Sequence, residues 1–217
     1  MNNIEQEEGT RLGLVDEPEL WLNLPNLVDE RNHPNHWFNR ASDLHAAAGA
    51  IWYAMGSKSV EVSKDLNFPP GFSMSVACWP VYHMLCGLAL EVIMKAVLVL
   101  RKTPPKKYEQ HGLNILTNLL ELKPSADEEK LLDFYNASLV WAGRYPTPKR
   151  ATDNKLKEYW GLASDVLTSP CTGPSPYGIS IRRGNNSTDW SEFTSLWQRY
   201  ASLFDHELAA RHHAASE

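Results

Sequence analysis

The chain has 217 residues, 43% of them hydrophobic, and a formal net charge of −5. This length suits one domain with a sizeable core, and 21 basic residues against 26 acidic ones exclude a strongly basic nucleic-acid-binding domain. The three cysteines, Cys78, Cys86 and Cys171, form no CxxC pair and cannot make a full disulfide set, so we expect reduced thiols in a cytoplasmic protein.

The N-terminal segment is predicted to be an irregular acidic arm over residues 1–34, followed by one helical domain over residues 35–214. Residues 1–30 hold eight acidic side chains and one basic one, Arg11, and three prolines interrupt the arm by residue 34. The acidic start, MNNIEQEEGT, is unlike a signal peptide.

The next segments follow a helix–loop–helix pattern. Apolar side chains recur every three or four positions over residues 36–55, which predicts a helix, and residues 57–72 are expected to form a loop. A second helix is predicted from about residue 73 to Lys102, with Pro80 in its first turns, where it either starts the helix proper or kinks it.

This second helix contains a charged pair in an apolar run. Residues 85–100 are short for a membrane span and include Glu91 and Lys95, so we expect a core helix and no membrane association. Glu91 and Lys95 are one helical turn apart in the favourable order. Because a lone buried charge is costly, they are predicted to form a structural polar pair that fixes how the helices register.

The rest of the chain adds further helices. A short helix follows His111, and Ser125 with Glu128 forms a capping box that opens a helix ending near Gly143. Another helix is expected over residues 153–168. Residues 169–187 are predicted to be a loop with a short strand at 177–181, and a second capping box at Asp189 opens a last helix to about residue 213. The fold class is therefore all-α, a bundle of five to six helices.

Three motifs stand in a recognisable order, LALEVIMKAVL, QHGLNILTNLL and GRYPTP. Over about residues 36–168 the chain resembles the HEPN superfamily of small helical bundles. That resemblance implies a protein that forms a homodimer or pairs with a partner protein, and that acts on RNA or belongs to a toxin–antitoxin, anti-phage or stress system. Active members are metal-independent endoribonucleases in which an Arg, and a His four to six residues further on, from both protomers share one cleft.

The family order places an Arg after the penultimate helix, which corresponds to Arg144. The same order implies that His111 and Arg144 are the polar neighbours of the Glu91–Lys95 pair. No His follows Arg144 within seven residues, so we expect contact with RNA or a nucleotide, and catalysis at Arg144 would need a His from elsewhere in the fold. Tyr145, His111, Lys149 and Arg150 are the further candidates for that contact, since guanidinium and ammonium groups bind phosphate and a tyrosine ring stacks on bases.

A catalytic pair is predicted, as the alternative, at Arg199 and His206. Six residues separate them, so on one long helix they would share a face about two turns apart. Such a pair would use His as general acid or base and Arg to hold the phosphate. Arg31 and His36 also fit the spacing, but they precede the bundle and enclose Pro34.

No metal site and no cofactor are expected, because His206, Glu207 and His212 miss the HExxH spacing and the glycines occur singly. The leading hypothesis is thus a catalytically degenerate HEPN-like module that binds RNA, a nucleotide or a partner protein. The alternatives are an active endoribonuclease with a composite Arg/His site at a dimer interface, and a structural subunit whose acidic arm covers a partner or a basic surface.

Overall fold

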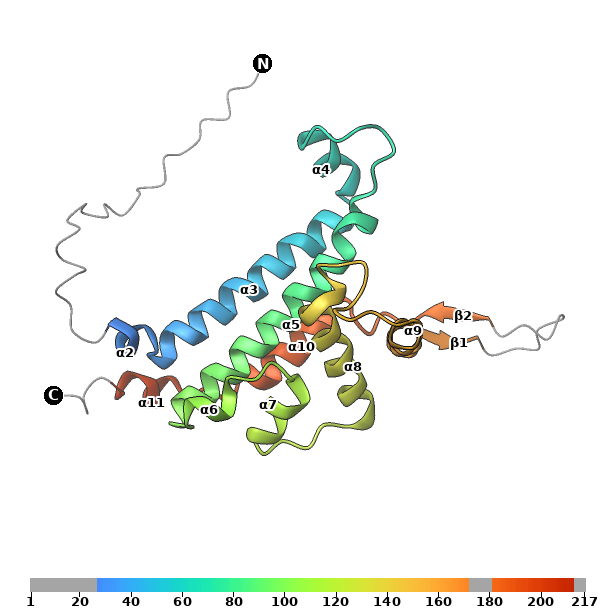
Figure 1. Cartoon of the computed structure of the whole chain (residues 1–217). Helices are drawn as coiled ribbons and strands as arrows, with labels where there is room; N and C mark the ends of the chain where they lie inside the picture. The colour runs from blue at the N-terminus through green and yellow to red at the C-terminus, as the bar shows by residue number, and fades with distance from the viewer. Residues whose placement is uncertain (1–26, 172–180, 213–217) are drawn as a thin grey trace, which may run out of the picture. The chain divides into compact units, whose positions relative to one another are not determined.

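The computed structural model describes residues 27–171 and 181–212, and it confirms the all-α helical bundle (Figure 1). The chain divides into two units, Met1–Arg31 and Asn32–Glu217. In the first, the described part is helix α2 (Leu27–Arg31), so the prediction of an irregular segment is wrong for these five residues. Residues 1–26, which carry most of the predicted acidic arm, lie outside the described residues.

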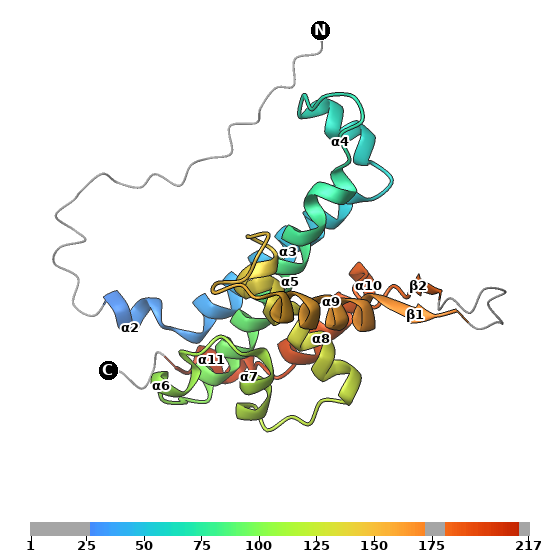
Figure 2. The ribbon, with the colours of Figure 1, turned by 45° about the vertical axis from the view of Figure 1, so that its right-hand side comes forward.

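Two long helices, α3 (Pro34–Met55) and α5 (Met74–Leu100), lie side by side and form the centre of the second unit (Figures 1 and 2). Helix α3 begins two residues earlier than predicted. Pro34 suits the first turn because it needs no intrahelical N–H partner there, and His33 Nδ1 accepts a hydrogen bond from the Asn35 N–H at 3.2 Å.

Helix α5 is the core helix that its apolar run predicts. Its second half is buried on all sides, by α3, α7, α8 and α10. The helix is long and apolar enough to cross a membrane, and 78% of its most apolar window is buried against the rest of the fold. Pro80 lies inside α5 rather than at its start.

The connection between α3 and α5 was expected to be a loop, and that prediction is wrong in its first half. Residues Ser59–Asp65 form the short helix α4, which sits at the far end of the α3–α5 pair (Figure 2). An ion pair one turn apart, Lys58 Nζ to Glu61 Oε2 at 2.8 Å, supports this helix.

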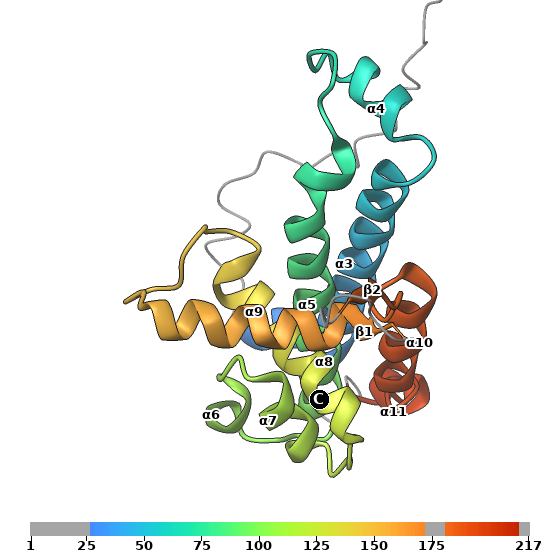
Figure 3. The ribbon, with the colours of Figure 1, turned by 90° about the vertical axis from the view of Figure 1, so that its right-hand side faces the viewer.

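After α5 come α6 (Pro105–Tyr108), α7 (Leu113–Leu119) and α8 (Ala126–Ala137). Helix α8 continues directly into a π-helical turn, η1 (Ser138–Ala142), which was not predicted. Helix α9 (Asp153–Leu167) packs against α8 and runs across the direction of α5 (Figure 3).

A two-stranded antiparallel ladder follows α9, with β1 (Thr168–Pro170) paired to β2 (Arg182–Gly184). These residues were expected to be helix end and loop. Of the strand predicted at residues 177–181, only Ile181 lies within the described residues, and it is not in a strand.

The predicted last helix is in fact two helices, α10 (Trp190–Ala201) and α11 (His206–Ala210). Between them Phe204 turns into the core, where it is 5% exposed, and the Asp205 carboxylate accepts a hydrogen bond from the Leu208 N–H at 2.9 Å. Asp205 thereby caps a new helix. The capping box predicted at Asp189 is wrong, since its side chain makes no capping bond.

The capping box at Ser125 is half confirmed. Ser125 Oγ accepts a hydrogen bond from the Glu128 N–H at 3.2 Å, as expected for an N-cap. The Glu128 carboxylate does not reach back to the cap. It accepts from the Tyr200 hydroxyl at 2.8 Å and pairs with Arg199, and so joins α8 to α10.

Candidate functional site

The buried carboxylate of Glu91 contacts two other polar side chains, Lys95 and His111. Glu91 Oε1 accepts a hydrogen bond from Lys95 Nζ at 2.6 Å and lies 2.9 Å from His111 Nδ1. Glu91 and Lys95 are 4% and 7% exposed, so the predicted polar pair is present in the core. The predicted contact with His111 is confirmed, and through it Glu91 links α5 to the segment before α7.

His111 itself reaches the surface, where its side chain is 69% exposed. Arg144 was expected beside this cluster as well, and that prediction is wrong. Its guanidinium donates to the Val140 carbonyl and lies 5.5 Å from the centre of the Tyr145 ring. The two predicted nucleotide contacts, His111 and Arg144, therefore belong to different parts of the bundle.

The geometry predicted for Arg199 and His206 is wrong, because the two residues lie on different helices. Arg199 turns to α8, where it pairs with Glu128. The His206 ring lies edge-on against Phe38 of α3 and Phe204, with centroids 4.7 and 5.0 Å apart. In one protomer they therefore face separate neighbours.

The surroundings of Arg199 are also acidic. It lines a groove of about 580 Å³ between α8, α9 and α10, in which one further cation, Lys130, stands among the carboxylates of Asp127, Asp165 and Glu192. Carboxylates at this density repel phosphate oxygens, and the charge of Arg199 is already paired with Glu128.

A second concave surface, here named the α9 groove, lies between η1, the segment at residues 143–152 and α9. Its volume is about 620 Å³. Aromatic side chains (Trp141, Tyr145, Tyr159), basic side chains (Arg144, Lys149, Lys155), one carboxylate (Glu158) and smaller apolar groups (Ala137, Val140, Pro148, Leu162) line it. Of the five predicted nucleotide-contact residues it gathers Arg144, Tyr145 and Lys149, while Arg150 and His111 are not in its lining.

Close packing of α5 against η1 places one wall of the α9 groove. A Cβ at Gly143 would come within 2.5 Å of Met84 Cβ and 2.8 Å of the Ser138 carbonyl oxygen, so the chain needs a glycine here. The Gly143 N–H donates to that same carbonyl at 2.9 Å, five residues back, which is the π-helical hydrogen bond. The chain leaves η1 directly after this contact, and Arg144 and Tyr145 are the next residues.

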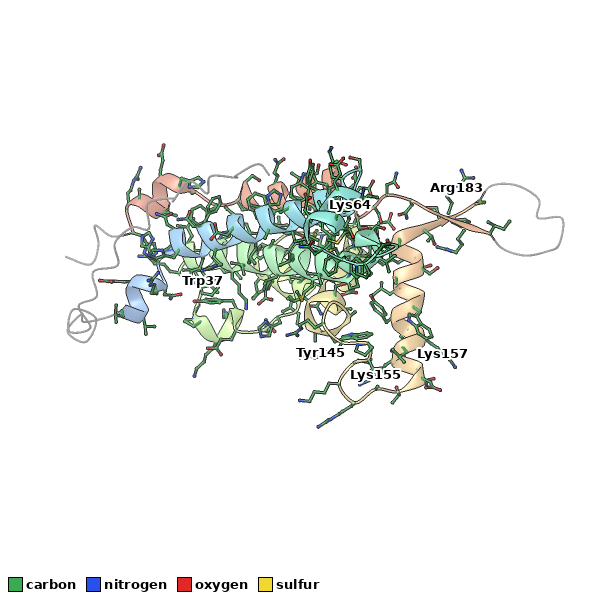
Figure 4. The ribbon with its side chains drawn as sticks, turned by 90° about the horizontal axis from the view of Figure 1, so that it is seen from above. Trp37, Lys64, Tyr145, Lys155, Lys157 and Arg183 are labelled. Carbon is green, nitrogen blue, oxygen red and sulfur yellow. The ribbon has the colours of Figure 1, made fainter. Side chains whose placement is uncertain are left out.

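The opposite wall is the start of α9. Thr152 Oγ1 accepts from the Lys155 N–H at 3.3 Å and so begins the helix with Lys155 in its first turn. Figure 4 shows Tyr145 and Lys155 on the side of α9 that faces the bundle, while Lys157 points the other way. Lys155 was not among the site residues predicted from the sequence. Thr152, which precedes a segment with helical apolar periodicity, could have indicated a helix N-terminus with Lys155 in its first turn.

The rings in the α9 groove differ in exposure. Trp141 and Tyr159 meet edge to face with centroids 4.8 Å apart, and burial raises the pKa of the Tyr159 hydroxyl. Tyr145 is 58% exposed, and the Arg144 guanidinium stands over one face of its ring. One aromatic pair thus forms the floor, and an exposed ring stands at the rim with a cation beside it.

Over residues 27–171 and 181–212, no three His, Cys, Asp or Glu side chains gather in a way that could hold a metal ion. The described part of the α9 groove offers cations and rings rather than metal ligands.

Comparison of the chain with protein-family models, with curated proteins and with solved structures finds no match.

Proposed function

We propose that this protein is a HEPN-like helical module that binds single-stranded RNA or a nucleotide in the α9 groove. The observation that carries the proposal is the composition of that groove, in which three aromatic rings and three cations surround a single carboxylate. Proteins that bind single strands combine these two elements, because rings stack on bases and cations follow the phosphates.

Different side chains of the α9 groove suit contact with the bases and with the phosphates. Tyr145 is the exposed ring, so it is the side chain available for a base to stack on. Lys149, from the segment before α9, and Lys155, from its first turn, both line the groove, and both side chains are exposed. A strand whose base stacks on Tyr145 would have its phosphates within reach of these ammonium groups.

The proposal does not include catalysis. Ribonuclease chemistry of the HEPN kind needs an Arg free to hold phosphate beside a His that moves a proton. Arg199 is paired with Glu128 in an acidic groove, and His206 packs against Phe38. Arg144 in the α9 groove has neither a histidine nor a carboxylate pair among the lining residues.

Fluorescence anisotropy with labelled single-stranded oligonucleotides, in the presence of EDTA, tests the proposal. Tyr145→Ala should weaken binding by about 1–3 kcal/mol, the range for loss of one stacked base. Lys155→Ala should reduce the slope of log K against log salt by about 0.7, as for one phosphate contact with a single strand.

Lys157→Ala is the matched control for Lys155→Ala, because it removes the same charge two residues away on the face of α9 outside the groove. Equal effects of the two lysine substitutions would mean that only net charge is sensed, and the α9 groove would not be the binding site. The labelled RNA is also examined on a gel after incubation. Cleavage that Arg199→Ala or His206→Ala abolishes would replace the proposal with the endoribonuclease alternative.

A further inference from the structure

The α9 groove contains one carboxylate among its cations, that of Glu158, and no cation of the groove neutralises it. Glu158 is exposed, and within the part of the chain that the structure describes it forms no ion pair, although Lys155 stands one turn earlier on the same helix. A negative charge weakens the attraction of a surface for phosphate. In a groove that binds a nucleic acid, this carboxylate is therefore unfavourable unless it contacts the ligand itself.

Glu158 lies on the face of α9 that forms one wall of the α9 groove. The lining residues of this helix are Lys155, Glu158, Tyr159 and Leu162, and their spacing puts them on one helical face. Tyr159 belongs to the aromatic pair at the floor, so Glu158 stands beside a ring as well as one turn from a cation. A nucleotide matches such a wall, because its phosphate and the polar edge of its base are separate groups.

A carboxylate distinguishes the four RNA bases by the donors on their Watson–Crick edges, which single strands leave exposed. An ionised carboxylate only accepts hydrogen bonds, and it has two oxygens side by side. Guanine carries N1–H and the N2 amino group next to each other, so both oxygens can accept at once. Adenine and cytosine have a ring-nitrogen acceptor beside their amino group, and uracil has one N–H between two carbonyl oxygens. Each of these three bases therefore sets an acceptor against the carboxylate.

From these observations we infer that guanine is the base that the α9 groove selects, with the Glu158 carboxylate accepting hydrogen bonds from its N1–H and N2–H groups. The inference rests on the proposed function, because it assigns the base within the same groove. Tyr145 supplies the exposed ring, with the Arg144 guanidinium on one face of it, and Lys155 supplies a cation for phosphate. Glu158 lowers the affinity for every strand by repelling phosphate, and it compensates for that loss only when the base is guanine.

Fluorescence anisotropy with five labelled oligouridine strands tests the inference. The strands differ only in their central base, which is guanine, hypoxanthine, adenine, cytosine or uracil. The guanine strand should bind about tenfold more tightly than the adenine, cytosine and uracil strands, within the range for one good pair of hydrogen bonds to a base. Hypoxanthine keeps the N1–H of guanine but lacks the amino group, so its strand should bind with an affinity between those of the guanine and uracil strands.

Glu158→Gln should remove most of this preference, because the amide keeps one acceptor and turns a donor towards the donors of guanine. The readout is the ratio of the guanine-strand affinity to the uracil-strand affinity. The loss of a negative charge strengthens the binding of every strand alike and so cancels in this ratio. Glu129→Gln on α8 is the matched control, since Glu129 is an exposed carboxylate outside the lining of the α9 groove, and it should leave the ratio unchanged. Circular dichroism checks that both variants are folded.

Equal binding of all five strands, weakened throughout by Tyr145→Ala, overturns the inference and leaves the proposed function standing. Binding of no strand overturns both. A guanine preference that survives Glu158→Gln, or that Glu129→Gln also removes, overturns the inference as well. Competition with free GMP and AMP separates the two sources of the base. Displacement of the guanine strand by GMP alone supports a guanine nucleotide as ligand, displacement by neither supports guanine within RNA, and equal displacement by both contradicts selection by Glu158.

Discussion

His83 should make this protein sensitive to mild acid. Its ring is 2% exposed, and the rings of Trp79, Tyr82, Phe134 and Tyr135 lie 4.5, 5.3, 4.9 and 6.2 Å from it. Burial among these rings lowers the pKa of His83 to about 3 from its ordinary 6.5, because the imidazolium would lose its hydration there.

The direction of the effect follows from which state binds the proton. Below pH 6.5 the unfolded chain takes up a proton at His83, while the folded chain resists until about pH 3. The stability that depends on neutral His83 is therefore complete above pH 6.5 and is lost progressively between pH 6.5 and pH 3. Between pH 7 and pH 4.5 the loss amounts to about 2.5 kcal/mol, at about 1.4 kcal/mol per pH unit.

Urea unfolding at pH 7 and at pH 4.5, for the wild-type chain and for His83→Phe, measures this quantity. The phenyl ring cannot be protonated, so the variant should lose about 2.5 kcal/mol less than the wild type over that interval. Any packing change from the phenyl ring is present at both pH values and cancels in the difference. His36→Phe, at an exposed histidine, controls for the added phenyl ring. Equal losses for the wild type and His83→Phe would refute the reasoning.

Three further substitutions probe packing and polar contacts by the same unfolding assay. Glu91→Leu alone leaves the Lys95 charge unpaired in the core and should cost about 3–5 kcal/mol, whereas Glu91→Leu with Lys95→Leu should recover most of that loss. An equally unstable double variant would show that the cost does not come from the unpaired charge of Lys95. Gly143→Ala should cost about 1–3 kcal/mol, since its Cβ would meet Met84 Cβ at 2.5 Å, and an unchanged midpoint would show that α5 yields there. Ser125→Ala should cost about 1 kcal/mol through loss of the α8 cap, and Ser125→Asp, which keeps a cap acceptor, should retain most of the stability.

The core of the fold follows from local sequence patterns. The buried run of α5 and the Glu91–Lys95 pair could be predicted, because a charged pair in an apolar helix has few ways to be satisfied. The contact with His111 was expected from the family order of motifs, which named Arg144 as well, and only His111 makes the contact. The Ser125 cap could also be predicted, because it depends only on two residues that are three apart in one helical turn.

What could not be predicted depends on contacts between distant segments. Residues 201–206 contain no proline or glycine, and the helix breaks there because Phe204 enters the core and Asp205 caps α11. The carboxylate of Glu128 leaves its own helix start for Arg199 and Tyr200, 71 and 72 residues away. Lys155 joins Arg144 and Tyr145 only because α9 folds back beside η1. The helix propensity of a short stretch of sequence does not determine such contacts between distant segments.

The π-helical turn at Ser138–Ala142 has a consequence for how this chain tolerates insertion and deletion. A π turn holds one residue more than an α-helical turn in the same length of helix. Removing a single residue here, such as Leu139, would place Gly143 four residues after Ser138, so α8 would continue as an ordinary helix in the same length. Arg144 and Tyr145 would then keep their positions beside α9. A residue removed from the α-helical part of α8 would instead turn everything after it by about 100°, the angle between successive residues at 3.6 per turn. The π turn is therefore the place in this helix where the loss of one residue disturbs the α9 groove least.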